Sequence, residues 1–243
     1  MAHTLKEKDF VTIDYTGRVK NEGYIFDTTL ESVAKENHLY NPGIKYGSVT
    51  TCVGKGLILE ALDNALIGKE IGKDYTIEIN SGDSFGKRSA SLIKLVPTST
   101  FKKQGIKPVP GLQVTVDGSM GVIKTVSGGR VIVDFNHPLA GKDLVYEVKI
   151  KDLVDDKVEQ VKSVLELKLN IKKENVDVRF DKEKNSINIL MDIDFPKEFE
   201  KEFADFIKDC VDVKEVKFEK KSQKKASEKS DSKEKSSGKN LSE

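Results

Sequence analysis

Hydrophobic and polar positions alternate along several stretches of the first 153 residues, a pattern typical of half-buried β-strands. The alternation covers Val11–Val19 and resumes in Tyr24–Phe26 after a glycine-containing turn, which predicts a hairpin. Tyr75–Ile79 and Leu144–Ile150 predict two further strands, and the second is apolar enough to lie inside a sheet. Leu30–Tyr46 has no period and carries many turn residues, so a long irregular loop is expected there.

Apolar residues at helical spacing occur in three segments. Ile58–Leu66 gathers its apolar side chains on one face and is followed by Gly68, which predicts a short helix with a left-handed cap. Further along, one apolar stripe covers Val158–Leu169 and a phenylalanine-rich face covers Phe199–Cys210. Short β runs lie between and after these two stripes, so the order α-β-β-α-β predicts a two-layer α/β domain.

The segment Lys87–His137 has a pattern of its own. It begins with three prolines and continues with short β runs around a Ser-Gly-Gly turn, which predicts a small β module inserted into a parent domain. Five apolar residues of this module form either an exposed patch that binds unfolded chains or a tight core. They are Val122, Ile123, Val131, Ile132 and Val133.

Charge and cysteine usage narrow the classes of function. Charged residues make up 33% of the chain but the net charge is only +1, so the chain lacks the overall field of a DNA-binding or membrane-surface protein. Cys52 and Cys210 have no ligand spacing, which predicts buried free thiols in a reducing compartment. With neither a signal-like segment nor an apolar run of bilayer length, the chain is expected in the cytoplasm. The Lys/Ser/Glu-rich segment 220–243 is expected to be a disordered tail.

The sequence assembles no catalytic set for covalent or acid–base chemistry. His3, His38 and His137 have no partner spacing for a triad or a metal site, so neither a metal nor a cofactor is expected. Asp63 and Glu70 are expected on solvated faces. What remains is an apolar candidate site with one charge, formed by Tyr15, Phe26, Asp27, Ile58, Leu59, Leu62, Phe85 and Tyr146.

Asp27 is the single charge of that set, and its role is open from the residues alone. A buried carboxylate is costly unless it is hydrogen-bonded, so Asp27 could be a polar anchor on a pocket wall. The D-T-T sequence is also good turn chemistry, so Asp27 could instead cap a turn through Thr28 or Thr29. The apolar members of the set have the same two interpretations, as pocket wall or as core.

Four ordered blocks of sequence resemble the FKBP-type peptidyl-prolyl isomerases. They are Y-T-G-R-V with Y-I-F-D-T-T, V-G-K-G-L-I-L-E-A-L-D-N-A-L-I-G-K-E-I-G-K, S-F-G, and N-H-P-L-A-G-K-D-L-V-Y-E-V. The segment between S-F-G and P-L-A-G matches the place where SlyD-like members carry an inserted flap domain with chaperone activity. V-P-T-S-T-F and F-N-H-P-L-A-G are typical of that subgroup, and the extension after residue 153 resembles the long archaeal members.

This resemblance implies an α+β fold in which an antiparallel sheet wraps on a short helix, with an all-β flap and a C-terminal two-layer α/β domain. The implied domains are 1–86 plus 138–153 for the isomerase, 87–137 for the flap, 154–219 for the C-terminal domain and 220–243 for the tail. The C-terminal domain is expected to form a homodimer, because its phenylalanine face is broad for so small a unit.

The resemblance also implies that the eight residues of the candidate site form the isomerase pocket, with the backbone amide of Leu59 donating to the substrate carbonyl. Three positions depart from the family pattern: Ala61 replaces a glycine, Leu62 a tryptophan and Phe85 a tyrosine. Loss of that tyrosine hydroxyl removes one hydrogen bond worth about 0.5 to 1.5 kcal/mol, so activity should be reduced and not abolished.

The implied function is non-covalent rotation about X-Pro bonds, combined with chaperone activity. The expected ligands are unfolded or proline-containing polypeptides and macrolide inhibitors of the FKBP class. A binding-only holdase or assembly factor is the alternative, since the departures at Ala61 and Phe85 could leave a pocket without useful turnover.

Overall fold

The computed structural model describes residues 3–221, and its internal contacts divide the chain into two units. The first unit holds the described residues up to Asp14, Ser48–Lys73 and those from Lys149 onward, and the second holds Tyr15–Gly47 and Asp74–Val148. The fold is mixed α/β with antiparallel sheets and few helices, as the sequence predicts. The expected tail lies outside the described residues from position 222 onward.

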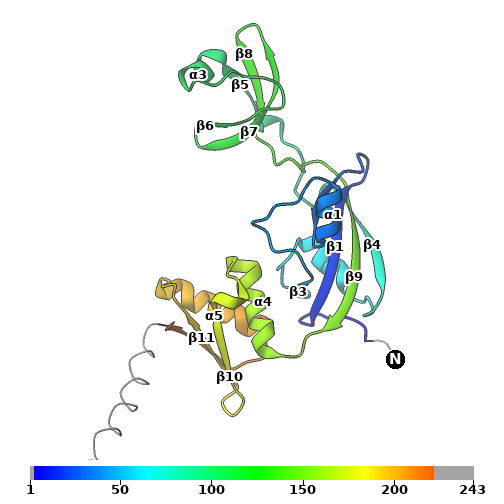
Figure 1. Ribbon diagram of the computed structural model, residues 1–243, viewed down its shortest axis with the longest axis vertical. Coiled ribbons are helices and arrows are strands. Elements are labelled where there is room, and N and C mark those ends of the chain that lie inside the picture. The colour runs from blue at the N-terminus through cyan, green and yellow to red at the C-terminus, as the bar shows by residue number, and fades with distance from the viewer. Residues whose placement is uncertain (1–2, 222–243) are drawn as a thin grey trace, which may run out of the picture. The chain divides into compact units, whose positions relative to one another are not determined.

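A five-stranded sheet with residues in both units is built on the predicted hairpin. Its strands lie in the order β2–β1–β9–β4 and are β1 (Phe10–Val19), β2 (Ile25–Thr28), β4 (Asp74–Ile79) and β9 (Leu144–Leu153) (Figure 1). β1 and β2 are antiparallel, with Gly17 opposite Asp27 and a bulge between Gly17 and Arg18. Because side chains alternate along a strand, this register sets which residues of β1 and β2 share a face.

A short helix, α1 (Glu31–Glu36), stands where an irregular loop is expected, so the prediction for that stretch is wrong in part. Six residues are too few to show a helical period. The helix is stabilised by burial of Ala34 and by an i,i+4 ion pair of 2.7 Å between Lys35 and Glu31.

The inserted segment of the second unit forms a four-stranded antiparallel sheet in the order β5–β8–β7–β6 (Figure 1). Its elements are a 3-10 turn (Ala90–Leu92), β5 (Ile93–Pro97), α3 (Thr98–Lys103), β6 (Gln113–Val116), β7 (Ser119–Ser127) and β8 (Arg130–Asp134). The expected all-β module is corrected by α3, whose Phe101 is 0% exposed in the core of this sheet. A helix this short forms because tertiary burial of one ring outweighs its weak intrinsic stability.

In the first unit, β3 (Val49–Cys52) pairs antiparallel with the first half of β1, so that Phe10 lies opposite Cys52. The predicted helix follows as α2 (Glu60–Leu66) and buries Leu62 and Leu66.

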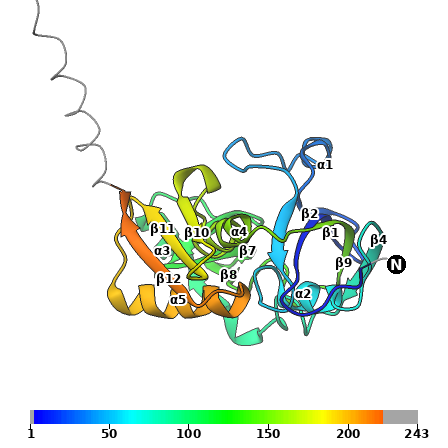
Figure 2. The same ribbon diagram turned by 90° about the horizontal axis from the view of Figure 1, so that it is seen from below.

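The C-terminal part of the first unit has the predicted order α-β-β-α-β (Figures 1 and 2). Its elements are α4 (Lys157–Leu169), a 3-10 turn (Lys173–Asn175), β10 (Asp177–Asp181), β11 (Ser186–Met191), α5 (Lys197–Cys210) and β12 (Glu215–Lys220). β10 and β11 form an antiparallel hairpin, and α5 crosses over to place β12 parallel to β11. α4 is capped by Asp156, whose carboxylate accepts hydrogen bonds from two first-turn amides. Within residues 3–221, no helix has both the length and the apolar character needed to cross a bilayer.

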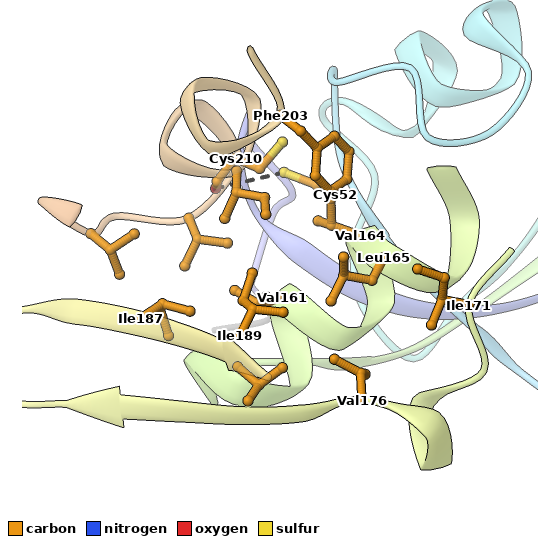
Figure 3. Packing of buried hydrophobic residues seen from close by; sticks show 14 of the residues in the cluster. Cys52, Val161, Val164, Leu165, Ile171, Val176, Ile187, Ile189, Phe203 and Cys210 are labelled. Carbon is orange, nitrogen blue, oxygen red and sulfur yellow. Dashed lines mark hydrogen bonds between the residues drawn. The ribbon is translucent and has the colours of Figure 1, made fainter. Parts of the chain in front are cut away.

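One apolar cluster joins this C-terminal part to β3. Figure 3 shows Val161 of α4 beside Ile189 of β11, and Phe203 of α5 beside Cys52, all within this cluster. The same cluster contains three residues from earlier in the chain, Phe10, Cys52 and Leu57. Cys52 is a free thiol, as predicted, and its Sγ lies 3.9 Å from the carbonyl oxygen of Cys210. The C-terminal part and β3 therefore share one core.

Candidate active site

A group of aromatic rings gathers on the β2–β1–β9–β4 sheet, and it contains half of the residues expected in the pocket. Tyr15 of β1 and Phe26 of β2 each contact Tyr146 of β9 edge-on, with ring centroids 5.8 Å apart in both pairs. Phe85, in the loop after β4, meets Phe26 edge-on at 6.4 Å. Tyr146 is buried and the other three rings are half-buried, so one side of the group is open to solvent.

Gly17 allows this close packing, and it was not among the expected site residues. A Cβ at this position would lie 2.8 Å from Cζ of Phe26 and 2.9 Å from Cε1 of Tyr146. Such distances are well inside van der Waals contact, so any side chain here would displace both rings. An isolated glycine within a strand pattern signals close approach of another group, and that signal was present in Y-T-G-R-V.

Asp27 places one carboxylate beside these rings. The hydroxyl of Tyr15 donates a hydrogen bond of 2.9 Å to Oδ2 of Asp27. Asp27 is exposed as a whole residue, but loss of hydration next to the rings raises the pKa of its carboxyl, partly offset by the Tyr15 hydroxyl and the Thr28 amide. Burial, together with the Asp27 charge, raises the pKa of the Tyr15 hydroxyl, which therefore stays protonated and able to donate at neutral pH.

The turn chemistry of D-T-T is carried mainly by the two threonines. Oγ1 of Thr29 accepts from the amide of Tyr15 at 2.9 Å, and Oγ1 of Thr28 accepts from the amide of Leu30 at 3.1 Å. Both threonine residues are buried. Asp27 is thereby left to pair with a side chain of the ring group, although its carboxylate also lies near the Thr28 amide.

His137 is a second residue that the sequence interpretation left out of the site. Its imidazole stacks on Phe85, with ring centroids 4.4 Å apart and planes 9° from parallel. The sequence placed His137 only in a His-Pro turn, and a contact across 52 positions leaves no local signal. The stacking gives the Phe85 ring a second aromatic contact in addition to its edge-on contact with Phe26.

The remaining three expected pocket residues lie in the first unit. Ile58 and Leu59 are half-buried at the start of α2, whereas Leu62 is only 1% exposed and holds the helix in the core. Asp63, on the same helix, corrects an expectation: it is 1% exposed, and its Oδ2 accepts a 2.7 Å hydrogen bond from the amide of Gly56. Glycine-rich turns need such an acceptor for their free amides, and this outweighs the cost of burying the carboxylate.

The five expected client-binding residues of the inserted module fall into two groups. Ile123, Val131 and Val133 are 0% exposed and form the core with Phe101, so their side chains cannot reach a client in this conformation. Val122 and Ile132 are half-buried on the other face of the sheet. Leu95, paired with Ile132 across β5 and β8, is 56% exposed. The exposed apolar face of the module therefore differs in composition from the predicted one.

Comparison with known proteins shows which sequences this chain is similar to. Residues 94–139 match the family model described as FKBP26, IF domain. A short-type peptidyl-prolyl cis-trans isomerase from Methanocaldococcus jannaschii is 35% identical over 153 residues, which cover 63% of this chain and 96% of the relative. A probable FKBP-type 16 kDa peptidyl-prolyl cis-trans isomerase from Pseudomonas fluorescens is 33% identical over 106 residues, 42% of this chain and 69% of the relative. The FKBP-type isomerase SlyD from Yersinia pestis is 31% identical over 40% of this chain and 51% of the relative. The chain belongs to the FKBP-type peptidyl-prolyl cis-trans isomerases.

Proposed function

We propose that this protein is a peptidyl-prolyl cis-trans isomerase that acts on unfolded or partly folded polypeptides. The observation that carries the proposal is the ring group around Tyr146, which presents apolar surface and one carboxylate in a chain of this family. Rotation about an X-Pro bond breaks amide resonance against a barrier of roughly 18 to 20 kcal/mol. Water stabilises the planar, dipolar ground state, so an apolar surface favours the twisted transition state without any covalent step.

Each residue of the candidate site has a proposed role. The rings of Tyr15, Phe26, Phe85 and Tyr146 form the apolar surface against the proline. Asp27, oriented by the Tyr15 hydroxyl, is the polar anchor near the twisting bond. Ile58 is assigned to the apolar wall, Leu62 supports the wall from the core of α2, and the backbone amide of Leu59 is assigned as the donor to the substrate carbonyl. Macrolide inhibitors of the FKBP class are proposed to bind at the same residues.

A protease-free isomerisation assay on a short proline peptide tests this proposal. We expect turnover by the wild-type protein and a fall in kcat/KM of about tenfold or more for Phe26→Ala and for Asp27→Leu, which corresponds to about 1.4 kcal/mol each. Phe101→Ala is the control, because it empties the core of the inserted module and leaves the ring group intact. Absence of turnover at high protein concentration would refute the enzyme and leave the binding-only holdase as the function.

We also propose that residues 87–137 form a flap domain that holds unfolded clients. Its support is the apolar face on which Leu95, Ile93 and Met120 are 56%, 39% and 70% exposed. A polar pair of changes, Leu95→Ser with Ile132→Ser, should abolish suppression of client aggregation and slow proline-limited refolding of a whole protein. Turnover of a short peptide should stay the same, and unchanged aggregation suppression would refute the holding role.

The remaining domain assignments are proposed on the same basis. Residues 1–86 with 138–153 form the isomerase domain, and 154–219 form a C-terminal domain that mediates homodimerisation. Its α5 leaves Phe199 and Phe206 only half-buried beside the stacked Phe203, which supports a second copy as their partner. A monomeric mass by light scattering would contradict the dimer. The two free buried thiols support a reducing compartment such as the cytoplasm.

A further inference from the structure

The loop between β3 and α2, residues 54–57, contacts the C-terminal helices α4 and α5. Gly54 and Gly56 have φ of +77° and +61°, a left-handed backbone that other residues adopt only with strain. Leu57 is 7% exposed and belongs to the cluster shared with α4 and α5. The loop leads directly into Ile58 and Leu59, which belong to the candidate site.

The peptide groups of Gly56 are held from two sides by charged side chains. On one side, Asp63 of α2 accepts from the Gly56 amide at 2.7 Å. On the other, Nζ of Lys168 on α4 donates to the Gly56 carbonyl oxygen at 2.8 Å, across 112 positions of sequence. Lys168 is itself oriented by α5, since its ammonium lies 5.2 Å from the centre of the Phe206 ring.

A second contact fixes the neighbouring residue of the loop. The side chain of Lys55 is only 12% exposed, and its Nζ lies 2.7 Å from Asp209 of α5 and 3.1 Å from Glu7. Asp209 also binds Lys8, and these two ammonium groups lower the pKa of its carboxyl to about 2. The C-terminal helices therefore hold the loop through two charged side chains as well as through apolar packing.

We propose that Lys168 and Asp209 of the C-terminal domain are positioning residues for the isomerase, acting through loop 54–57 on the backbone of Leu59. The inference rests on the proposed function, in which the Leu59 amide binds the substrate carbonyl. Its physical basis is that a donor misplaced by about 1 Å can cost up to a hundredfold in rate. Loop 54–57 is rich in glycine, so without outside contacts its backbone has several conformations available. The C-terminal domain then has a catalytic consequence in addition to any role in assembly.

The Lys168 contact with the Gly56 carbonyl is exposed and contributes little to global stability. A positioning role therefore predicts a large fall in kcat/KM with a small fall in Tm, whereas a merely structural role predicts that the two fall together. Because an exposed charged contact adds little stability, Lys168→Met should lower Tm by no more than about 2 to 4 °C. Its effect on kcat/KM for a short proline peptide should nevertheless be a fall of about five- to tenfold. Asp209→Asn should have a similar effect, since it releases Lys55.

The chain offers matched controls on the same two helices. Lys162 of α4 has no ion pair or hydrogen-bonding partner for its side chain among residues 3–221, so Lys162→Met should keep wild-type turnover. Asp205 of α5 pairs with Lys208 on its own helix, at 2.5 Å, and with no other ammonium group in the described part of the chain, so Asp205→Asn should do the same. Lys168→Arg keeps a donor within reach of Gly56 and should restore most of the activity.

The measurements are kcat and KM in the peptide assay, Tm, and hydrogen exchange of the amides of residues 54–59, all on the full chain. We expect Lys168→Met and Asp209→Asn to speed exchange in this segment and to lower kcat/KM, with Lys168→Arg close to wild type. If Lys168→Met and Asp209→Asn both turn over the peptide as fast as the wild type, the inference is wrong and the proposed function is unaffected. A wild-type protein without turnover would overturn both. Equal loss in Lys168→Arg or in Lys162→Met would also overturn it, because the effect would not depend on a donor to Gly56.

Discussion

Gly17→Ala is the most direct test of how the ring group works. The added methyl would lie 2.8 Å from Cζ of Phe26 and 2.9 Å from Cε1 of Tyr146, whereas ordinary carbon contacts are about 3.5 to 4.0 Å. Both rings must therefore move by about 0.7 Å or more, or the strand must shift. Overpacking of this size costs about 1 to 3 kcal/mol in free energy of unfolding.

The functional effect of the same change should be larger than its effect on stability. Displaced rings no longer match the twisted proline, so we expect kcat/KM for a short proline peptide to fall by about ten- to a hundredfold. Urea unfolding and the peptide assay measure the two effects on the same samples. Gly82→Ala is the matched control, since a Cβ there meets nothing within 4 Å and its backbone is not left-handed.

A double-mutant cycle identifies the clash as the cause. Phe26→Leu removes the ring atoms nearest to Gly17, so the stability costs of Gly17→Ala and Phe26→Leu should not add. Wild-type kcat/KM in Gly17→Ala would refute the argument that ring placement governs turnover. Additive stability costs would show that the strain lies elsewhere.

Four further outcomes follow from the contacts described. Tyr15→Phe should lower kcat/KM by up to about tenfold, because it removes one hydrogen bond worth about 0.5 to 1.5 kcal/mol, and retention of full activity would contradict the role of that bond. Because the pKa of Asp27 lies above 3.8, kcat/KM should be flat at neutral pH and fall as pH drops through that raised value, whereas Asp27→Asn should show no such fall. The pKa of Asp209, lowered to about 2, adds stability that is complete above pH 3.8 and is lost as pH falls toward 2; urea unfolding of Asp209→Asn should lack this loss. Phe101→Ala should destabilise the inserted module by about 3 to 5 kcal/mol, seen as faster hydrogen exchange there, with peptide turnover unchanged.

The predicted elements that the structure confirms are those with a clear period. The first hairpin, α2 and the α-β-β-α-β order could be read from alternation or helical spacing, because burial of one face imposes that spacing. α1, α3 and β5 could not, since each has only five or six residues and depends on tertiary contacts such as burial of Phe101. Short elements of this kind are stabilised mainly by tertiary contacts and only weakly by their own sequence.

For the candidate site, the residue types could be predicted from the sequence, but the contacts between them could not. Tyr15 and Asp27 could be nominated together, but their hydrogen bond depends on the register of β1 against β2. Stacking of His137 on Phe85 and burial of Asp63 depend on the conformations of irregular loops. Hydrophobic periodicity in the sequence does not predict such conformations. The glycine at position 17 was the one clue in the sequence that could have been used.

The shared core around Cys52 has a consequence for the order in which this chain matures. Phe10, Cys52 and Leu57 are among the first quarter of the chain to leave the ribosome, yet their packing partners Ile207, Cys210 and Val211 follow some 150 residues later. During synthesis, this apolar surface stays uncovered until α4 has emerged, and it is covered fully only when α5 follows. A protein that we propose to bind unfolded polypeptides is therefore itself incompletely folded, with apolar surface exposed, during its own synthesis.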